Sequence, residues 1–133
     1  MFKLIKIENA RMNVPEPVFH EVKASEAVQL GEALVLTSGK LTKCGATVKP
    51  EFIAMADCAA AATDRIIPVA RVEANQLYEV PITAAPSSLA EGSKVTLHTA
   101  GMQVTATTTS GVVTVESLTG AAAAGDHIVV RLV

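Results

Sequence analysis

The C-terminal third of the chain alternates apolar and polar residues with a period of two. Four short runs show this pattern, at Lys94–His98, Met102–Thr107, Val112–Leu118 and His127–Val133, and Gly-containing turns separate them. Val and Thr dominate the runs, so the pattern predicts four β-strands in up-and-down order. One face of such a meander must be buried, so it needs a second layer or must close into a barrel.

A similar short phrase occurs three times in the chain. A Gly and a polar residue precede an apolar run at Gly31-Glu32, Gly92-Ser93 and Gly125-Asp126. Each phrase is typical of a tight turn that leads into a strand, because Gly adopts positive φ at little cost. The irregular spacing argues against a solenoid repeat and suits the corners of a small barrel.

The rest of the domain is also rich in short apolar runs. Pro68 and Pro81 lie inside two of them and indicate strand edges or bulges. Cys58–Thr63 is too short for a stable helix and is predicted to be a loop. We therefore predict an all-β chain, with a small β-barrel over residues 23–133. Its further strands are expected at Phe19–Lys23, Ala33–Thr37, Lys40–Lys43, Phe52–Asp57, Arg65–Val72 and Leu77–Ile82, the second and third forming a hairpin.

Residues 1–22 differ from the remainder and are predicted to form an extended N-terminal arm. Pro15 and Pro17 each fix their own φ and force the preceding residue out of the helical region. The alternative is an edge strand folded back on the domain. If the arm reaches a partner, its apolar and cationic side chains are the candidate contacts: Phe2, Lys3, Leu4, Ile5, Lys6, Ile7, Arg11, Val14, Pro15 and Pro17.

The amino-acid composition argues against several classes of function. Aromatic residues make up 3% of the chain and Trp is absent, which argues against sugar binding and base stacking. The net charge is −2 and no cationic cluster extends beyond Lys3 and Lys6, so we expect no nucleic-acid partner. No secretory signal or membrane-spanning run is evident, and Cys44 and Cys58 are expected to be free thiols.

No motif for catalysis or metal binding is present. His20, His98 and His127 are isolated, and neither cysteine belongs to a zinc-spaced pair. Pairs such as His20-Glu21 and Asp64-Arg65 carry no specific signal, because any chain of this length offers similar ones. We expect a protein without enzymatic activity, cofactor or metal.

The order of several phrases resembles a known family. The chain has GEALVL and SGKL early, RIIPVARV in the middle, and EGSKVTLHTAGMQVTAT and GDHIVVRL near the end. From about Ala27 to Val133 it resembles the capsid decoration, or head cement, proteins of tailed bacteriophages and prophages. The resemblance implies a β-barrel or β-tulip domain on the outer face of the mature capsid, made in the cytoplasm of the host bacterium.

The same resemblance implies a structural virion protein that bridges and stabilises coat subunits. Its partner would be the major capsid protein, with no nucleic acid, membrane or cofactor involved. An extended arm could add a strand to a neighbouring sheet, or could swap within a trimer or other homo-oligomer of the protein itself. Sequence reasoning leaves these two uses of residues 1–22 open.

Two alternative hypotheses about the function remain open from the sequence alone. The first is a ligand- or carbohydrate-binding β module of the adhesin type, against which the scarcity of aromatic residues counts. The second is a small barrel of the translation or biotin-carrier type. The chain lacks the modifiable Met-Lys hairpin that a biotin carrier needs.

Overall fold

A computed structural model describes the whole chain, residues 1–133, as ten β-strands with no helix. The predicted all-β class and the small barrel are confirmed. The strands are β1 (Lys3–Ile7), β2 (Pro17–Val22), β3 (Ala33–Thr37), β4 (Lys40–Lys43), β5 (Phe52–Ala54), β6 (Arg65–Arg71), β7 (Gln76–Pro81), β8 (Lys94–Val95), β9 (Val113–Ser117) and β10 (His127–Arg131).

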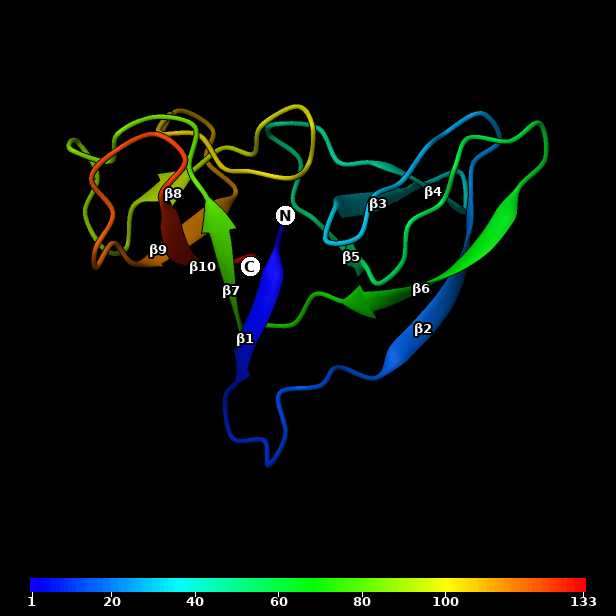
Figure 1. Cartoon of the computed structure of the whole chain (residues 1–133), viewed down its shortest axis with the longest axis horizontal. Helices are drawn as coiled ribbons and strands as arrows, with labels where there is room; N and C mark the ends of the chain where they lie inside the picture. The colour runs from blue at the N-terminus through cyan, green and yellow to red at the C-terminus, as the bar shows by residue number, and fades with distance from the viewer.

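The strands form two units that lie side by side (Figure 1). One is a closed barrel with the order β2-β4-β3-β5-β6, and the other is an open sheet with the order β1-β7-β10-β9-β8. The barrel encloses its own apolar core. A second core lies under the open sheet and includes Ala33, Cys44 and Ile53 from the barrel. The barrel thus covers the apolar face that the open sheet cannot bury alone.

The C-terminal meander lies in the open sheet and contributes no strand to the barrel. Strands β8, β9 and β10 are antiparallel neighbours, as predicted. The run Met102–Thr107 does not form a regular strand, because Val104 bridges both Leu97 and Ile82. The hydroxyls of Thr96 and Thr105 lie 2.7 Å apart in this irregular turn. The barrel is built instead from strands between Pro17 and Arg71.

The three Gly phrases act as predicted. Gly31, Gly92 and Gly125 have φ values of 78°, 88° and 91°, and β3, β8 and β10 each begin two residues later. The hairpin of β3 and β4 is also confirmed, with Leu36 opposite Leu41. These features depend on a few consecutive residues, which is why the local sequence predicts them well.

The N-terminal segment is folded back on the domain and does not extend as a free arm. This is the second of the two alternatives that the sequence left open. Strand β1 forms the edge of the open sheet beside β7, and β2 pairs with β6 along its whole length in the barrel. Residue 22 is therefore the end of a barrel strand in the structure, where we had expected the end of a separate arm. The physical reason is burial, because Phe2 and Val22 each lie in a core.

Pro68 and Pro81 lie at positions where a missing N–H disturbs the sheets little. Pro68 lies in β6, which has strands on both sides and is not an edge. Its carbonyl accepts the N–H of Met55, just beyond the end of β5. The missing N–H of Pro68 faces the same side, so the bonds of β6 with β2 are kept and only a bond to the carbonyl of Met55 is absent. Pro81 is the last residue of β7.

Both cysteines are buried and free, as expected. Cys44 belongs to the core under the open sheet, and Cys58 belongs to the barrel core. Burial raises the pKa of the Cys44 thiol to about 12, so this thiol stays protonated at neutral pH. The segment Cys58–Thr63 is a loop, as predicted.

Glu32 is an unusual group at the junction of the two units. Its side chain is 2% exposed and lies beside Gly101, whose carbonyl accepts the N–H of Ala33. One carboxylate oxygen accepts the N–H of Gln29, whereas Oε1 has no hydrogen bond and lies 3.6 Å from Lys43 Nζ. Burial raises the pKa of this carboxyl above its ordinary value of 4.5.

The raised pKa of Glu32 predicts a pH-dependent stability difference. The native state holds this proton more tightly than the unfolded chain, so ionisation destabilises the fold as pH rises above 4.5. We expect Glu32→Gln to raise the free energy of unfolding at pH 7 by about 1 kcal/mol, with a smaller gain at pH 4. Urea unfolding of both proteins at both pH values measures this, with Glu91→Gln as an exposed control. An equal difference at both pH values would contradict the assignment.

Gly111 lies where no side chain fits. A Cβ at this position would overlap the carbonyl of Lys94 and lie 2.7 Å from the N of Val95, at the contact of β8 with β9. We expect Gly111→Ala to lower the free energy of unfolding by about 1–3 kcal/mol. Gly120→Ala is the matched control, because its Cβ meets no atom within 4 Å and only its φ of 84° is unfavourable. Thermal unfolding of the two variants should rank Gly111→Ala as clearly less stable.

Candidate partner-binding site

Exposed apolar side chains concentrate near the N-terminus. Eight large hydrophobic residues are exposed, and five of them fall within the first 22 positions. Single exposed apolar residues are ordinary, so a candidate interaction site is sought where several lie on the same surface feature. The five are Met1, Ile5, Met12, Val14 and Phe19, and the other three are Leu30, Val48 and Ile66.

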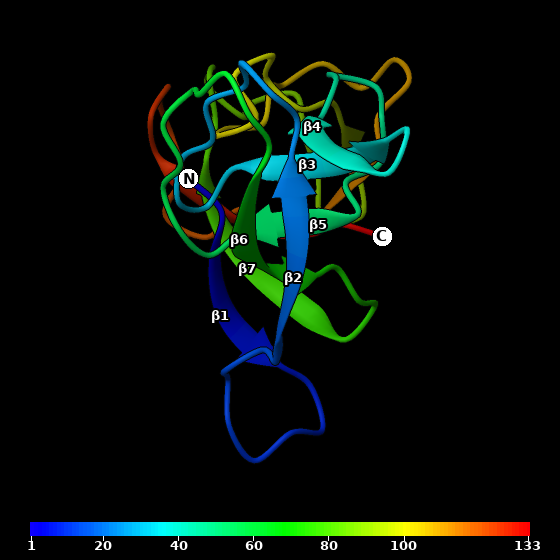
Figure 2. The same cartoon turned by 90° about the vertical axis from the view of Figure 1, so that its right-hand side faces the viewer.

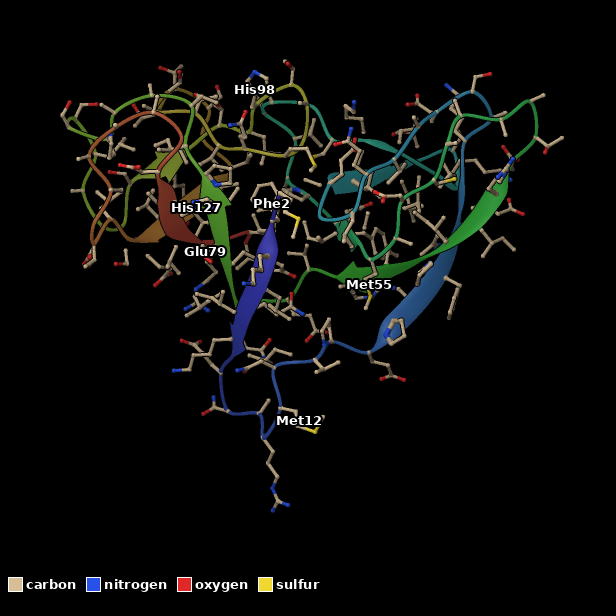
Figure 3. The ribbon with its side chains drawn as sticks, in the orientation of Figure 1. Phe2, Met12, Met55, Glu79, His98 and His127 are labelled. Carbon is tan, nitrogen blue, oxygen red and sulfur yellow. The ribbon has the colours of Figure 1, made fainter.

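The loop between β1 and β2, residues 8–16, projects beyond both units. Figures 1 and 2 show it extending below the barrel and the open sheet in two perpendicular views. Met12 lies near its far end and is labelled in Figure 3. Met12 is 68% exposed and Val14 is 67% exposed, so the loop presents two apolar side chains to solvent.

An arginine holds the start of this loop. The guanidinium of Arg131 on β10 donates to both carboxylate oxygens of Glu8, at 3.1 and 3.2 Å, and to Glu116 on β9 at 2.8 Å. It also contacts the carbonyl of Ala74. These hydrogen bonds lower the pKa of Glu8 and raise that of Arg131. Such a bidentate contact between a guanidinium and a carboxylate fixes the relative orientation of the two groups as well as pairing their charges.

Backbone contacts add to the same anchor. The N–H of Glu8 donates to the carbonyl of Asn75 at 2.7 Å, and the N–H of Ile7 donates to Oδ1 of Asn13 at 2.9 Å. Asn9 adopts a positive φ of 62°, which turns the chain outward. The loop therefore leaves the sheet in a defined direction, and this lowers the entropy that a partner would have to remove.

The ten predicted contact residues divide into three groups by burial. Phe2 is buried and packs edge-on against Tyr78, with ring centroids 6.4 Å apart, so it is unavailable to a partner. The partly buried members are Leu4, Ile7 and Pro15, and the exposed members are Lys3, Ile5, Lys6, Arg11, Val14 and Pro17. Met12 and Phe19 are exposed as well and were not among the predicted contacts. For Met12, an apolar residue between Arg11 and Asn13, the polar neighbours were the available signal.

The outer edge of β1 offers little room for an added strand. The N–H of Phe2 already donates to Gly31 at 2.9 Å, and that of Ile7 is capped by Asn13. The N–H and C=O groups of successive strand residues point to opposite edges. Between Phe2 and Ile7, Leu4 is therefore the residue whose N–H and C=O face the outer edge of β1. A register shift between Leu4 and Lys6 further twists this edge. Contacts by side chains are thus favoured over strand addition at β1.

A shallow apolar groove separates β1 from the barrel. Its volume is about 240 Å³ and nine of its twelve lining residues are hydrophobic, including Met1, Leu30, Met55 and Pro15. Figure 3 shows Met55 on the barrel side of this space and Phe2 on the other. The groove is large enough for one or two apolar side chains.

A second hollow, of about 410 Å³, lies at the side of the barrel and is more polar. The hollow is lined by Lys49, Glu51, Arg71 and Phe52, and the Arg71 guanidinium lies 5.2 Å from the Phe52 ring centroid.

No group of three or more His, Cys, Asp or Glu side chains could hold a metal ion. None of the elements is an apolar helix of membrane-spanning length.

The overall arrangement is similar to that of a protein of known structure. No family model and no curated protein matches this chain. The crystal structure of the head fiber gp8.5 N base in bacteriophage phi29 matches with a TM-score of 0.59 and 12% sequence identity, covering 89% of this chain and 95% of that one. The two proteins share a fold. At this identity the likeness concerns the arrangement of strands and not individual side chains.

The anchor at Arg131 can be tested by hydrogen exchange. We expect Arg131→Gln to speed exchange of the Glu8 and Ile7 amides by about tenfold, because the start of the loop loses its fixed carboxylate contact. Amides in the ladder of β7 and β10 should change less. Arg65→Gln, on the barrel, is the matched control. Uniform acceleration across all strands would instead indicate a global loss of stability.

Proposed function

We propose that this chain is a structural virion protein without enzymatic activity. In this proposal it binds the outer face of the mature phage capsid and stabilises contacts between coat subunits. The observation that carries the proposal is the anchored loop of residues 8–16, which presents Met12 and Val14 to solvent at more than 60% exposure. The fold likeness to a phage head fiber base and the family resemblance of the sequence support the same class.

The contact surface is the projecting end of the molecule. Met12 and Val14 supply apolar anchors, and Ile5 adds a third exposed apolar side chain on β1. Burying a Met or Val side chain contributes about 1.5–3 kcal/mol before the costs of association. Lys3, Lys6 and Arg11 are exposed in the same segment and could pair with acidic groups of the major capsid protein.

The mechanism of stabilisation is binding to one state of the shell. A protein that binds the mature shell and not its dissociated subunits shifts the equilibrium toward the shell by mass action. A rigid β body suits this task, because little order is lost when it binds. The buried junction of barrel and open sheet supplies that rigidity.

The proposal is tested by binding to empty, expanded shells of the phage that encodes the chain. We expect the wild-type protein to co-sediment with these shells in a saturable way. The double variant Met12→Ser with Val14→Ser should bind at least about tenfold more weakly, because both apolar anchors are lost.

Val48→Ser is the matched control, because Val48 is an exposed apolar residue outside the N-terminal segment. It should bind like wild type. Thermal unfolding should be similar for all three proteins, since these side chains are on the surface. Failure of the wild-type protein to bind would refute the proposed function. Equal binding by the double variant would refute only the role of the loop.

A further inference from the structure

Strand β2 has a free edge, because only one of its two sides is paired along the whole strand. On one side it pairs with β6 from Pro17 to Val22. On the other side it pairs with β4 at a single position, Val22 opposite Leu41. Figure 2 shows β2 extending downward from there, away from the hairpin of β3 and β4. The part of β2 from Pro17 to Glu21 therefore has no neighbouring strand on this side.

The register of the barrel strands shows which backbone groups face the free edge. The carbonyl of Pro68 accepts the N–H of Met55, so the peptide groups of Pro68 face away from β2. Phe19 lies opposite Pro68, and its N–H and C=O accordingly face away from β6. By alternation, the peptide groups of Pro17 and Glu21 face the same free edge. No hydrogen bond outside the strands involves the backbone of Phe19 or the N–H of Glu21.

Two positions on this edge lack a usable group. Pro17 has no N–H to donate. The carbonyl of Glu21 is occupied, because the parallel register turns it toward the N–H of Leu41, whose own carbonyl accepts the N–H of Lys23. An ordinary strand laid along the edge would leave its N–H opposite Glu21 and its C=O opposite Pro17 without partners. Unpaired groups of this kind weaken binding, so the edge discriminates between partner strands.

We propose that the free edge of β2 binds the same edge of a second copy of this chain, as an antiparallel strand pair with Phe19 on the two-fold axis. In this register the two copies of Phe19 exchange both of their backbone hydrogen bonds. Pro17 of each copy lies opposite Glu21 of the other, and the N–H of Glu21 meets the C=O of Pro17. The missing N–H and the occupied C=O fall on the same pair. Every backbone group that the edge offers is then satisfied.

The side chains are compatible with this register. Phe19 is 64% exposed, and the two Phe19 side chains become cross-strand neighbours, an aromatic pair that stabilises sheets. Glu21 and Asp64 share the ammonium of Lys40, which leaves one negative charge in each copy. Glu21 faces Pro17 of the other copy and not a second carboxylate. The two Glu21 residues lie roughly 14 Å apart along the strands, at about 3.4 Å per residue, which exceeds the screening length of about 10 Å.

Each end of the strand pair brings opposite charges together. Pairing stops at Glu21, because β4 occupies the edge beyond it, and Figure 1 shows the chain turning away at the start of β2. Glu16 of one copy therefore lies near the exposed Lys23 and Arg65 of the other. None of these three side chains has an ion pair in its own chain. The two cations offset Glu16 and the negative charge that Lys40 leaves.

The first test traps the pair with a cysteine on the two-fold axis. Opposite residues that exchange hydrogen bonds have Cα atoms about 5.5 Å apart, within the reach of a disulfide. With oxidised glutathione as the oxidant, we expect Phe19→Cys to form linked dimers at least about tenfold faster than Ile66→Cys. Ile66 is the matched control, because it is 66% exposed and lies on β6, away from the free edge. Cys44 and Cys58 are buried in both variants.

A mixture of two further variants tests the register. In the proposed pair, position 17 of one copy lies opposite position 21 of the other. We therefore expect an equimolar mixture of Pro17→Cys and Glu21→Cys to form linked dimers faster than either variant alone, by about tenfold. Thermal unfolding of each reduced variant shows whether its monomer keeps its fold.

A backbone variant tests the hydrogen bonds themselves. Phe19→Pro removes an N–H that has no partner in the single chain, whereas Phe19→Ala keeps this N–H and loses only the ring. The contact is short, so association is followed by sedimentation velocity at concentrations up to about 1 mM. We expect Phe19→Pro to associate at least about tenfold more weakly than Phe19→Ala, with similar thermal unfolding of the two.

Several outcomes would overturn the inference. Linkage of Phe19→Cys no faster than that of Ile66→Cys would do so, as would a mixture of Pro17→Cys and Glu21→Cys that links no faster than its parts. Loss of shell binding by Phe19→Pro, with no self-association of the wild type, would assign the edge to a strand of a coat subunit instead. The cross-linking tests use no shells, so their failure is distinct from failure of the proposed function.

Discussion

The packing of the open sheet on the barrel is the contact on which the rest of the molecule depends. The sheet has one apolar face, and Ala33, Cys44 and Ile53 of the barrel complete the core beneath it. A five-stranded open sheet would otherwise expose that face to water, at a cost of about 25 cal/mol per Å². This packing also brings β1 to the margin beside the barrel, and so determines where the N-terminal segment crosses between the two units (Figure 1).

Some apolar residues of the N-terminal segment are buried in the core and others are exposed to solvent. Phe2 fills the core against Tyr78, and Arg131 fixes Glu8 where the loop leaves the sheet. In the loop that follows these two contacts, Met12 and Val14 do not pack against either core and are exposed to solvent. Firm attachment on either side of an exposed apolar tip is the arrangement expected of a preorganised contact, because the tip loses little freedom on binding.

The likeness to the phi29 head fiber base has a physical basis in burial. At 12% identity few side chains are shared, yet the arrangement of strands is retained over 89% of this chain. Cores tolerate wide substitution when apolar patterning and total volume are kept. Surface features such as the projecting loop are under no such constraint, so the proposal about this loop depends on this chain's own residues.

The sequence by itself determined the local elements of this protein. The alternation of apolar residues located most strands, and Gly31, Gly92 and Gly125 marked three strand starts, because both signals depend on adjacent residues. The tertiary structure decided which strands pair and which apolar residues are buried. Phe2 and Met12 both read as apolar residues of an arm, and only Phe2 meets a core. Strand pairing joins residues distant in sequence, and no period-two pattern encodes the identity of the partner strand.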